Sequence, residues 1–256
     1  MTERLYHTDS YLREFDATVV GLDRDEGAIA LDRSAFYPGG GGQPYDLGVI
    51  EAGGAATAVT KVKARGEYVW HWLAGELPEE GVDVHGSLDW ERRYRLMRTH
   101  TSMHILCGIV WRDYGAQVTG GNMEPLHGHL DFEFETLQQE LVAEIETRIL
   151  AEVAAAREVR VRSLLRAEAF KIPDLIRTKI NLLPEAIQQV RTVEIVGLDL
   201  QADGGTHVAN TREVGAVRVA KYKSKGRINK RIYLELDPPD SIDPPDGVDT
   251  ADADTG

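Results

Sequence analysis

The sequence has little cysteine and no long apolar run. Cys107 is the only cysteine among 256 residues, so a disulfide framework within the chain is excluded. A lone cysteine also fits a reducing compartment. No apolar stretch approaches the roughly 18 residues that a membrane-spanning helix needs, and the first thirty residues lack the basic and apolar regions of a secretory signal. We therefore expect a soluble, cytoplasmic protein with no membrane partner.

Basic residues are scarce as well. The chain has 21 arginines and 8 lysines against 42 acidic residues, and its formal charge is −13. An acidic surface disfavours indiscriminate binding to DNA or other nucleic acids, because phosphate contacts need local positive charge. The segment 237–256 carries seven aspartates, no basic residue and two Asp-Pro-Pro triplets. It cannot bury enough apolar surface to fold, so we predict a disordered acidic tail there.

The first part of the chain, residues 1–88, is expected to form a small β-barrel or sandwich. Short apolar segments alternate there with turn residues, which is typical of such folds. The strands that this pattern predicts are 17–20, 28–31, 48–50, 58–62 and 68–72.

A glycine-rich loop lies between the second and third of these strands. It contains four consecutive glycines, Gly39–Gly42, followed by Gln43. Ordering four glycines costs backbone entropy, so the loop is either a connector or a place where the backbone closely approaches another group. It is not a Walker loop, because the Gly-Lys-Ser/Thr ending is absent.

Residues 89–236 are expected to form a second domain of the α+β class, a mixed sheet with helices packed on one face. Apolar residues recur at helical spacing in 89–114 and in 137–157, and a shorter helix is expected at 166–170. Between the two long helices, 115–121 is predicted to turn. The strands that we predict are 130–134, 159–163, 192–196, 214–219 and 231–236.

Two histidines in the first of these helices are four residues apart. At that spacing His100 and His104 project from one helix face, where two imidazoles can bind a transition metal ion. His207 is a candidate third ligand, and Asp203 could supply an oxygen ligand or orient a liganding imidazole. A histidine pair alone is more often structural. The sequence does not favour a zincin peptidase, because Thr101 follows His100 where such enzymes have a catalytic glutamate.

Three motifs in order resemble one family. They are Trp90–His104 with its two histidines, Gly204-Gly-Thr-His207, and the glycine-rich segment 36–44. Together they resemble the editing domain shared by alanyl-tRNA synthetases and the free-standing alanyl-tRNA editing proteins of the AlaX family, over about residues 5–236. The resemblance implies a medium-length, two-domain form: a β-barrel followed by an editing domain.

The resemblance also implies an activity and a site. The activity is metal-dependent, ATP-independent hydrolysis of serine, and in some members glycine, from the acceptor end of alanine tRNA. The implied zinc ligands are His100, His104 and His207. The family commonly has cysteine at the fourth position, where this chain has Asp203, so a hard carboxylate replaces a soft thiolate. Cys107 is expected to be an ordinary packed thiol.

Other residues near the motifs are candidates for contact with the substrate. Thr101 is expected to take part in catalysis beside the histidines. The proton acceptor is left unassigned, because no glutamate adjoins the histidine pair. The expected substrate-binding residues are Ser34, Gly40, Gly41, Gly42, Gln43 and Thr206. The family places the glycine-rich loop over its editing pocket, and hydroxyl groups suit recognition of serine.

One basic segment interrupts the acidic sequence. Lys221–Arg231 carries six basic residues and no acid. We predict that this segment contacts tRNA phosphates. The residues concerned are Lys221, Lys223, Lys225, Arg227, Lys230 and Arg231. The alternative is a solvated hairpin whose lysines protect a sheet edge.

Two further functions remain open from the sequence. One is a tRNA-binding module with a degenerate metal site, because Asp203 replaces the usual cysteine. The other is an unrelated hydrolase of small esters or amides that kept the metal site. Protein partners are not indicated.

Overall fold

The computed structural model describes residues 1–176, 188–239 and 241–242. Most of the predicted disordered tail, 237–256, lies outside this part of the chain. The described residues divide into two compact units, 1–94 and 95–242. Within the described ranges, every helix is too short or too polar to cross a membrane.

The first unit contains a closed six-stranded barrel, as the sequence predicts. Its strands follow the order β2-β3-β7-β6-β5-β8, and each neighbouring pair is antiparallel. The strands are β2 (Glu14–Asp23), β3 (Ala28–Leu31), β5 (Gly48–Ala52), β6 (Ala55–Arg65), β7 (Tyr68–Leu73) and β8 (Asp83–Leu88). Two short strands, β1 (Glu3–Arg4) and β4 (Arg33–Ser34), pair in parallel beside the barrel.

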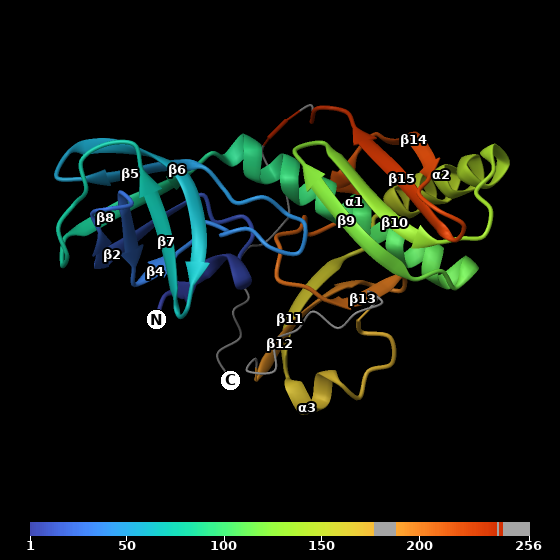
Figure 1. Ribbon diagram of the computed structural model, residues 1–256, viewed down its shortest axis with the longest axis horizontal. Helices are drawn as coiled ribbons and strands as arrows, with labels where there is room; N and C mark the ends of the chain where they lie inside the picture. Colours follow the sequence, from blue (N-terminus) through green and yellow to red (C-terminus); the bar gives the residue numbers. More distant parts are fainter. Residues whose placement is uncertain (177–187, 240, 243–256) are drawn as a thin grey trace. The chain divides into compact units, whose positions relative to one another are not determined.

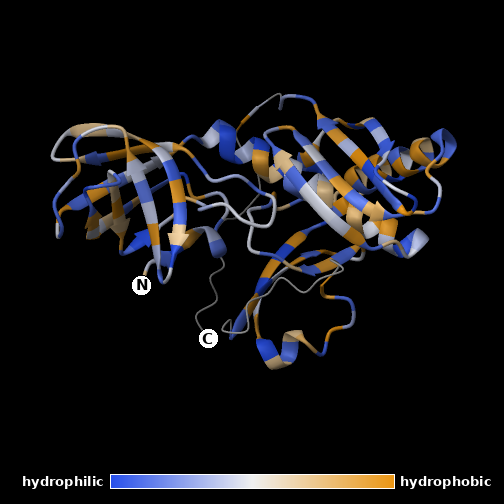
Figure 2. Cartoon of the chain, in the orientation of Figure 1, coloured by the Kyte–Doolittle hydropathy of each residue, from blue (hydrophilic) through white to orange (hydrophobic). Residues whose placement is uncertain are grey.

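The barrel is filled by one apolar core. Buried residues alternate with more accessible ones along much of β2 and along β7 and β8, so one side of each strand faces the inside of the barrel (Figure 2). Phe15, Ile29, Phe36 and Ile50 are among the residues of that core. Strand β8 was missed from the sequence because its DVHGSL run is polar and short. Closing the sheet on itself leaves no free strand edge.

The second unit contains two antiparallel sheets and the long helix α1 (Trp90–Tyr114), whose first turn belongs to the first unit (Figure 1). The α+β class is confirmed, although the strands divide between two antiparallel sheets instead of one mixed sheet. One sheet has the order β14-β15-β10-β9 and the other β11-β12-β13. The strands are β9 (Val118–Glu124), β10 (His127–Glu133), β11 (Val159–Leu165), β12 (Gln189–Ile195), β13 (Asp199–Ala202), β14 (Val217–Ser224) and β15 (Asn229–Leu236).

Helices α1 and α2 (Gln139–Ala154) pack on one face of the four-stranded sheet (Figure 1). A short helix, α3 (Arg166–Ala169), follows β11. The residues of α1 from Leu96 to Val110 are all buried, so this helix is enclosed on every side. Its histidines are therefore buried too.

The turn predicted at 115–121 is wrong in its second half, because β9 begins at Val118. Two glycines explain why this segment can pair so close to the helix. A Cβ on Gly121 would meet Leu130 Cδ2 at 2.6 Å, and one on Gly128 would meet Met103 Sδ at 2.7 Å. The absence of these side chains lets α1 approach the sheet closely. From sequence alone, glycine among polar residues suggests a turn. In this sheet the glycines instead leave room for the side chains that pack against them.

Candidate metal centre

The first two residues of the site come from one turn of α1. The rings of His100 and His104 lie 5.0 Å apart between centroids and are inclined by 78°. Both side chains are buried. The four-residue spacing therefore places both imidazoles on one face, as predicted.

The other two residues come from the loop that follows β13. Within it, the backbone N–H of Gly205 donates to Oδ2 of Asp203 at 2.7 Å. Nη1 of Arg191, on β12, donates to the carbonyl oxygens of Asp203 and Gly205 at 3.0 and 2.8 Å. The guanidinium group thus holds the loop in one shape, which carries His207 to the helix.

These elements bring together His100, His104, Asp203 and His207, which we call the ligand cluster. One potential metal-binding atom from each residue lies within 4.8 Å of all the others. Nε2 of His207 is 3.1 Å from Oδ2 of Asp203, and Nε2 of His100 is 3.6 Å from Oδ1. The ring of His207 lies 4.1 Å from that of His100 and 4.6 Å from that of His104, measured between centroids.

Neighbouring groups orient each imidazole. Oγ1 of Thr101 is 3.1 Å from Nδ1 of His207 and also accepts the N–H of Val208 at 3.3 Å. This contact leaves Nε2 of His207 directed toward the ligand cluster. The backbone of Thr206 forms a hydrogen bond with His100. Thr101, which we expected in catalysis, is thus engaged in holding His207.

Burial and mutual charge set the protonation of the cluster. Burial lowers the pKa of His100 to about 4, although the charge of Asp203 opposes this. Burial also lowers the pKa of His207 well below its ordinary value, helped by the charge of His100. Burial opposes ionisation of Asp203, but the neighbouring histidines outweigh it and hold its pKa well below the usual range. His100 and His207 therefore favour the neutral form and Asp203 the ionised form, which are the forms that bind metal.

The sequence reasoning missed Asp199, a buried carboxylate at the start of β13. Its Oδ2 lies 3.5 Å from Nδ1 of His104 and accepts a hydrogen bond from Nε2 of Gln201 at 2.5 Å. Burial opposes a charge on His104, but the bond to Asp199 outweighs it and raises the pKa of that histidine. Carboxylates beside liganding histidines commonly fix the ring orientation.

A glycine on α1 makes room for Asp199. A Cβ on Gly108 would lie 2.9 Å from Cβ of Asp199 and 3.0 Å from Cγ of Leu198. Gly108 is one helical turn beyond His104. The start of β13 therefore approaches the same face of α1 that carries His104. A glycine four residues after a candidate ligand was the only sequence signal for this contact.

The ligand cluster fits a zinc ion by its chemistry. Three imidazole nitrogens and one carboxylate oxygen form a usual donor set for zinc, and each donor is drawn from a rigid element or a clamped loop. Oδ2 of Asp203 already accepts from Gly205, which leaves Oδ1 as its less engaged oxygen. Cys107 is buried and stands outside the cluster, as expected of a packed thiol.

The predicted substrate-binding residues of the first unit have clear local roles. Ser34 is fully buried, and its hydroxyl bonds Nε2 of His71 at 2.8 Å and the N–H of Phe36 at 3.2 Å. These two bonds occupy it inside the barrel, so we leave Ser34 out of the proposed substrate pocket. Thr206, in the second unit, is buried beside the ligand cluster.

The glycine-rich loop has a conformation that only glycine adopts readily. Gly39–Gly42 all have positive φ, between 58° and 143°. Gly40 and Gln43 exchange two backbone hydrogen bonds of 3.0 and 2.9 Å, and the hydroxyl of Tyr37 donates to the carbonyl of Gly40 at 3.1 Å. The loop is thus an ordered tight turn. Its contact with substrate stays a prediction.

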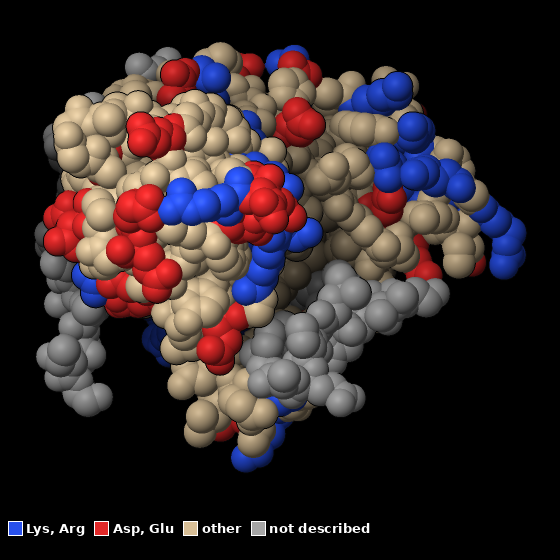
Figure 3. Space-filling model, turned by 60° about the vertical axis from the view of Figure 1, so that its left-hand side comes forward, with Lys and Arg blue, Asp and Glu red and all other residues tan. Residues whose placement is uncertain are grey.

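The predicted RNA-contacting residues form a hairpin, but they are not equivalent. Lys221, Lys223, Lys225 and Arg227 are exposed on β14 and its turn. Lys230 is buried, and its ammonium group donates to the carbonyls of Gly226 and Arg227 at 2.8 Å each. Arg231 makes two bonds to Asp131, of 2.6 and 2.8 Å. Lys230 and Arg231 therefore have less free charge to offer. Figure 3 shows a run of Lys and Arg side chains at the right-hand edge of the molecular surface.

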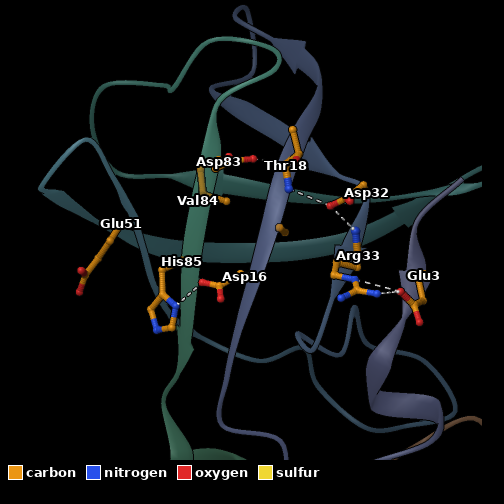
Figure 4. Close-up of a pocket in the computed structure, with 10 residues that line it drawn as sticks. Glu3, Asp16, Thr18, Asp32, Arg33, Glu51, Asp83, Val84 and His85 are labelled. Carbon is orange, nitrogen blue, oxygen red and sulfur yellow. Dashed lines mark hydrogen bonds and ion pairs between the residues drawn. The ribbon is translucent and has the colours of Figure 1, made fainter.

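A hollow on the barrel is unrelated to the ligand cluster. Half of its lining residues are acidic, and four of these five carboxylates pair with neighbours in the hollow (Figure 4). Nδ1 of His85 bonds Asp16 at 2.8 Å, and Arg33 bonds Glu3 at 2.6 Å. These pairs are exposed and satisfied, so they indicate no ligand.

Comparison with known proteins defines the class. Residues 11–92 match the family model for tRNA synthetases class II (A), and residues 190–233 match that for the threonyl and alanyl tRNA synthetase second additional domain. Both correspond to the editing domain of alanyl-tRNA synthetase. The chain is thus a relative of synthetase editing domains.

Full-length relatives identify the family. The alanyl-tRNA editing protein AlaX-M of Saccharolobus solfataricus is 39% identical over 93% of this chain and 100% of its own length. That of Methanosarcina barkeri is 37% identical over 92% and 99%. The alanine–tRNA ligase of Thermoplasma acidophilum is 37% identical over 91% of this chain but only 26% of its own length. The chain belongs to the AlaX-M family of alanyl-tRNA editing proteins.

Proposed function

We propose that this chain edits alanine tRNA by hydrolysing the ester of a wrongly attached amino acid, chiefly serine and secondarily glycine. The observation that carries the proposal is the convergence of the ligand cluster within 4.8 Å in a buried site. The names of its full-length relatives support alanyl-tRNA editing. Proposed partners are the acceptor end of alanine tRNA and one zinc ion, and the cytoplasmic location stays a prediction.

Each part of the site has a task in this proposal. His100, His104, His207 and Asp203 would hold the ion. When bound, zinc supplies a Lewis acid that polarises an ester carbonyl and acidifies water. Thr101 fixes the tautomer and orientation of His207 through the bond to Nδ1. Arg191 keeps the Asp203–His207 loop in register.

Selection of serine over alanine requires recognition of one hydroxyl group. A pocket whose polar groups pair with that hydroxyl rejects alanine, because alanine would leave them unpaired. We assign this task to Thr206, which is buried beside the ligand cluster. Contact of Gly40, Gly41, Gly42 and Gln43 with the substrate stays a prediction. The positive φ angles of Gly39–Gly42 give this loop a defined conformation, which supports a binding role over that of a loose connector.

The proposal is tested by comparing His104→Ala with His85→Ala, a histidine exposed on the barrel. We expect the unmodified protein to contain one zinc ion per chain by elemental analysis. It should also remove serine from alanine tRNA that is mischarged with serine. His104→Ala should lose the metal and at least about 100-fold in rate, since metal catalysis contributes several kcal/mol. His85→Ala should retain both. Because the chain is acidic, each assay is run over a range of salt concentrations.

A second function is motivated by the carboxylate at position 203. A site that binds metal weakly would leave a tRNA-binding module without hydrolysis. Tight tRNA binding with neither metal nor turnover in the unmodified protein would support that function and refute ours. Turnover of a small seryl ester at the same rate as the charged tRNA would instead indicate a general esterase.

A further inference from the structure

The four-stranded sheet has a polar outer face that carries an aromatic cluster. Strand pairing places Lys221 opposite Tyr233, and Tyr233 opposite His129 on β10. Two residues further along β14, Lys223 pairs with Arg231. Residues opposite each other on neighbouring strands point to the same side of a sheet. We call this side, with Lys221, Lys223, His129, Arg231 and Tyr233, the outer face.

Tyr233 lies at the centre of the outer face. Its ring centroid is 5.6 Å from Nζ of Lys223, 6.0 Å from Nζ of Lys221 and 5.7 Å from Cζ of Arg231. The ring of His129 is 5.4 Å away and tilted by 44°. The bond from Lys223 lowers the pKa of the Tyr233 phenol, as expected of a hydroxyl among cations. An accessible aromatic ring is therefore surrounded by positive charge.

The ligand cluster is on the other side of this sheet. Leu130 and Ile232, which alternate with the outer-face residues, are buried. Met103 of α1 packs against the inner face, at the positions of Gly121 and Gly128. Helix α1 thus lies between the sheet and the turn that holds Asp203 and His207. The outer face cannot hold the ester that the ligand cluster would cleave.

Among its cations, the two lysines have the most available charge. Both carboxylate oxygens of Asp131 bond Arg231, which reduces the charge that Arg231 can offer to a partner. Lys221 and Lys223 are exposed, and the next charges along the hairpin, Lys225 and Arg227, are basic too. In a chain of formal charge −13, such a local excess of positive charge suits a polyanion.

We propose that the outer face binds an unpaired nucleotide of the RNA substrate away from its acylated end, with the base stacked on Tyr233 and the phosphates beside Lys221 and Lys223. Base stacking on aromatic rings flanked by cations is the usual way in which sheets bind single-stranded RNA. The inference rests on the proposed function, because it takes RNA as the substrate. It adds a second contact, which anchors the RNA while its acylated end reaches the ligand cluster.

This arrangement separates binding from hydrolysis. Loss of the outer-face contact should raise KM for charged tRNA and leave kcat unchanged, because the reacting atoms are on the other side of α1. Variants of the ligand cluster should do the reverse, lowering kcat without weakening the binding of uncharged tRNA.

The test measures the affinity of uncharged alanine tRNA, a single-stranded 12-nucleotide RNA and a blunt RNA duplex by fluorescence anisotropy. Tyr233→Leu should weaken binding to the tRNA and the single strand by about tenfold, and binding to the duplex much less. Tyr233→Phe keeps the ring and should restore the affinity. Tyr222→Leu is the matched control, because Tyr222 pairs with Ile232 and so points to the opposite side.

A double variant, Lys221→Gln with Lys223→Gln, tests the phosphate contacts without touching the ring. Each lost contact should reduce the slope of log affinity against log salt by about 0.7 to 0.9. Circular dichroism verifies that each variant is folded. Equal affinities for Tyr233→Leu and the unmodified protein would refute the inference, as would equal losses on duplex and single strand. An outer face that binds an acidic protein and no RNA would also refute it.

The two proposals fail separately. Deacylation by the unmodified protein together with full RNA affinity of Tyr233→Leu would refute only the outer-face contact. RNA binding that depends on Tyr233 without any deacylation would refute only the hydrolase.

Discussion

Each unit of this molecule buries a group of charged or titratable side chains, and the two groups differ in how their polar atoms are arranged. In the first unit, Arg93 and Asp46 form a buried ion pair. Nε of Arg93 bonds both carboxylate oxygens, and Nη1 and Nη2 reach the carbonyls of Ser10 and Ala35 at 3.0 and 2.5 Å. The backbone N–H of Tyr37 completes the shell of Asp46 at 2.6 Å.

The ligand cluster of the second unit is also buried, but its polar atoms are arranged differently. Its four potential metal-binding atoms face one another, and the partners of the imidazoles, such as Thr101 and Asp199, approach from outside. The carboxylate of Asp46 is directed at one guanidinium group, whereas the four atoms of the ligand cluster converge on a common point that could hold a metal ion. Burial of charge therefore does not distinguish structure from function, but the direction of the lone pairs does.

The largest expected effect is on the barrel. Asp46→Ala leaves the guanidinium group of Arg93 buried without its counter-ion, which should cost about 3–5 kcal/mol of unfolding free energy. Urea denaturation measures this loss, with Asp25→Ala in an exposed turn as the control. Zinc affinity, measured on folded protein by chelator competition, should not change. A loss below about 1 kcal/mol would mean that the ion pair is not structural.

A smaller effect is expected from the group behind the metal site. Asp199→Asn keeps the size of the side chain but removes the charge that orients His104. Such outer partners typically contribute about 10- to 100-fold in metal affinity. Zinc competition should show that loss, while the unfolding free energy of the metal-free protein changes little. Gln201→Ala, which removes only the neighbour of Asp199, should have a smaller effect. The opposite ranking would contradict the positioning role of Asp199.

The smallest expected effect is on the stability that a partly exposed ion-pair network contributes. This network lies outside both the apolar core and the ligand cluster. Arg112 and Arg148 hold the pKa of Asp113 at about 2, below its ordinary value of 3.8. A lowered carboxyl pKa stabilises the fold above pH 3.8, and this stabilisation is lost as the pH falls toward 2. Asp113→Asn should therefore cost about 1 kcal/mol at neutral pH, and this cost should shrink as the pH falls through 2. Thermal unfolding across this range measures it, and a pH-independent difference would contradict the assignment.

Much of the fold was predictable because it depends on local periodicity. Helix α1 was expected at 89–114 and spans Trp90–Tyr114, and the barrel followed from short alternating strands. Strand β9 was missed, because Gly120 and Gly121 suggest a turn unless the packing of Met103 is known. The Lys221–Arg231 segment was treated as uniformly basic, whereas contacts with Gly226, Arg227 and Asp131 occupy two of its charges.

By itself, the sequence determined the spacing of His100 and His104, because one turn of helix places both rings on one face. It also placed His207 and Asp203 in a glycine-bounded turn that resembles a known motif. Only the tertiary structure decided that these groups converge, that Asp199 and Arg191 hold them, and that Tyr233 lies among cations on the other side of α1. The physical reason is distance along the chain: helical spacing is set by local backbone geometry, whereas contacts between residues about a hundred positions apart exist only once the sheets have packed around the helix.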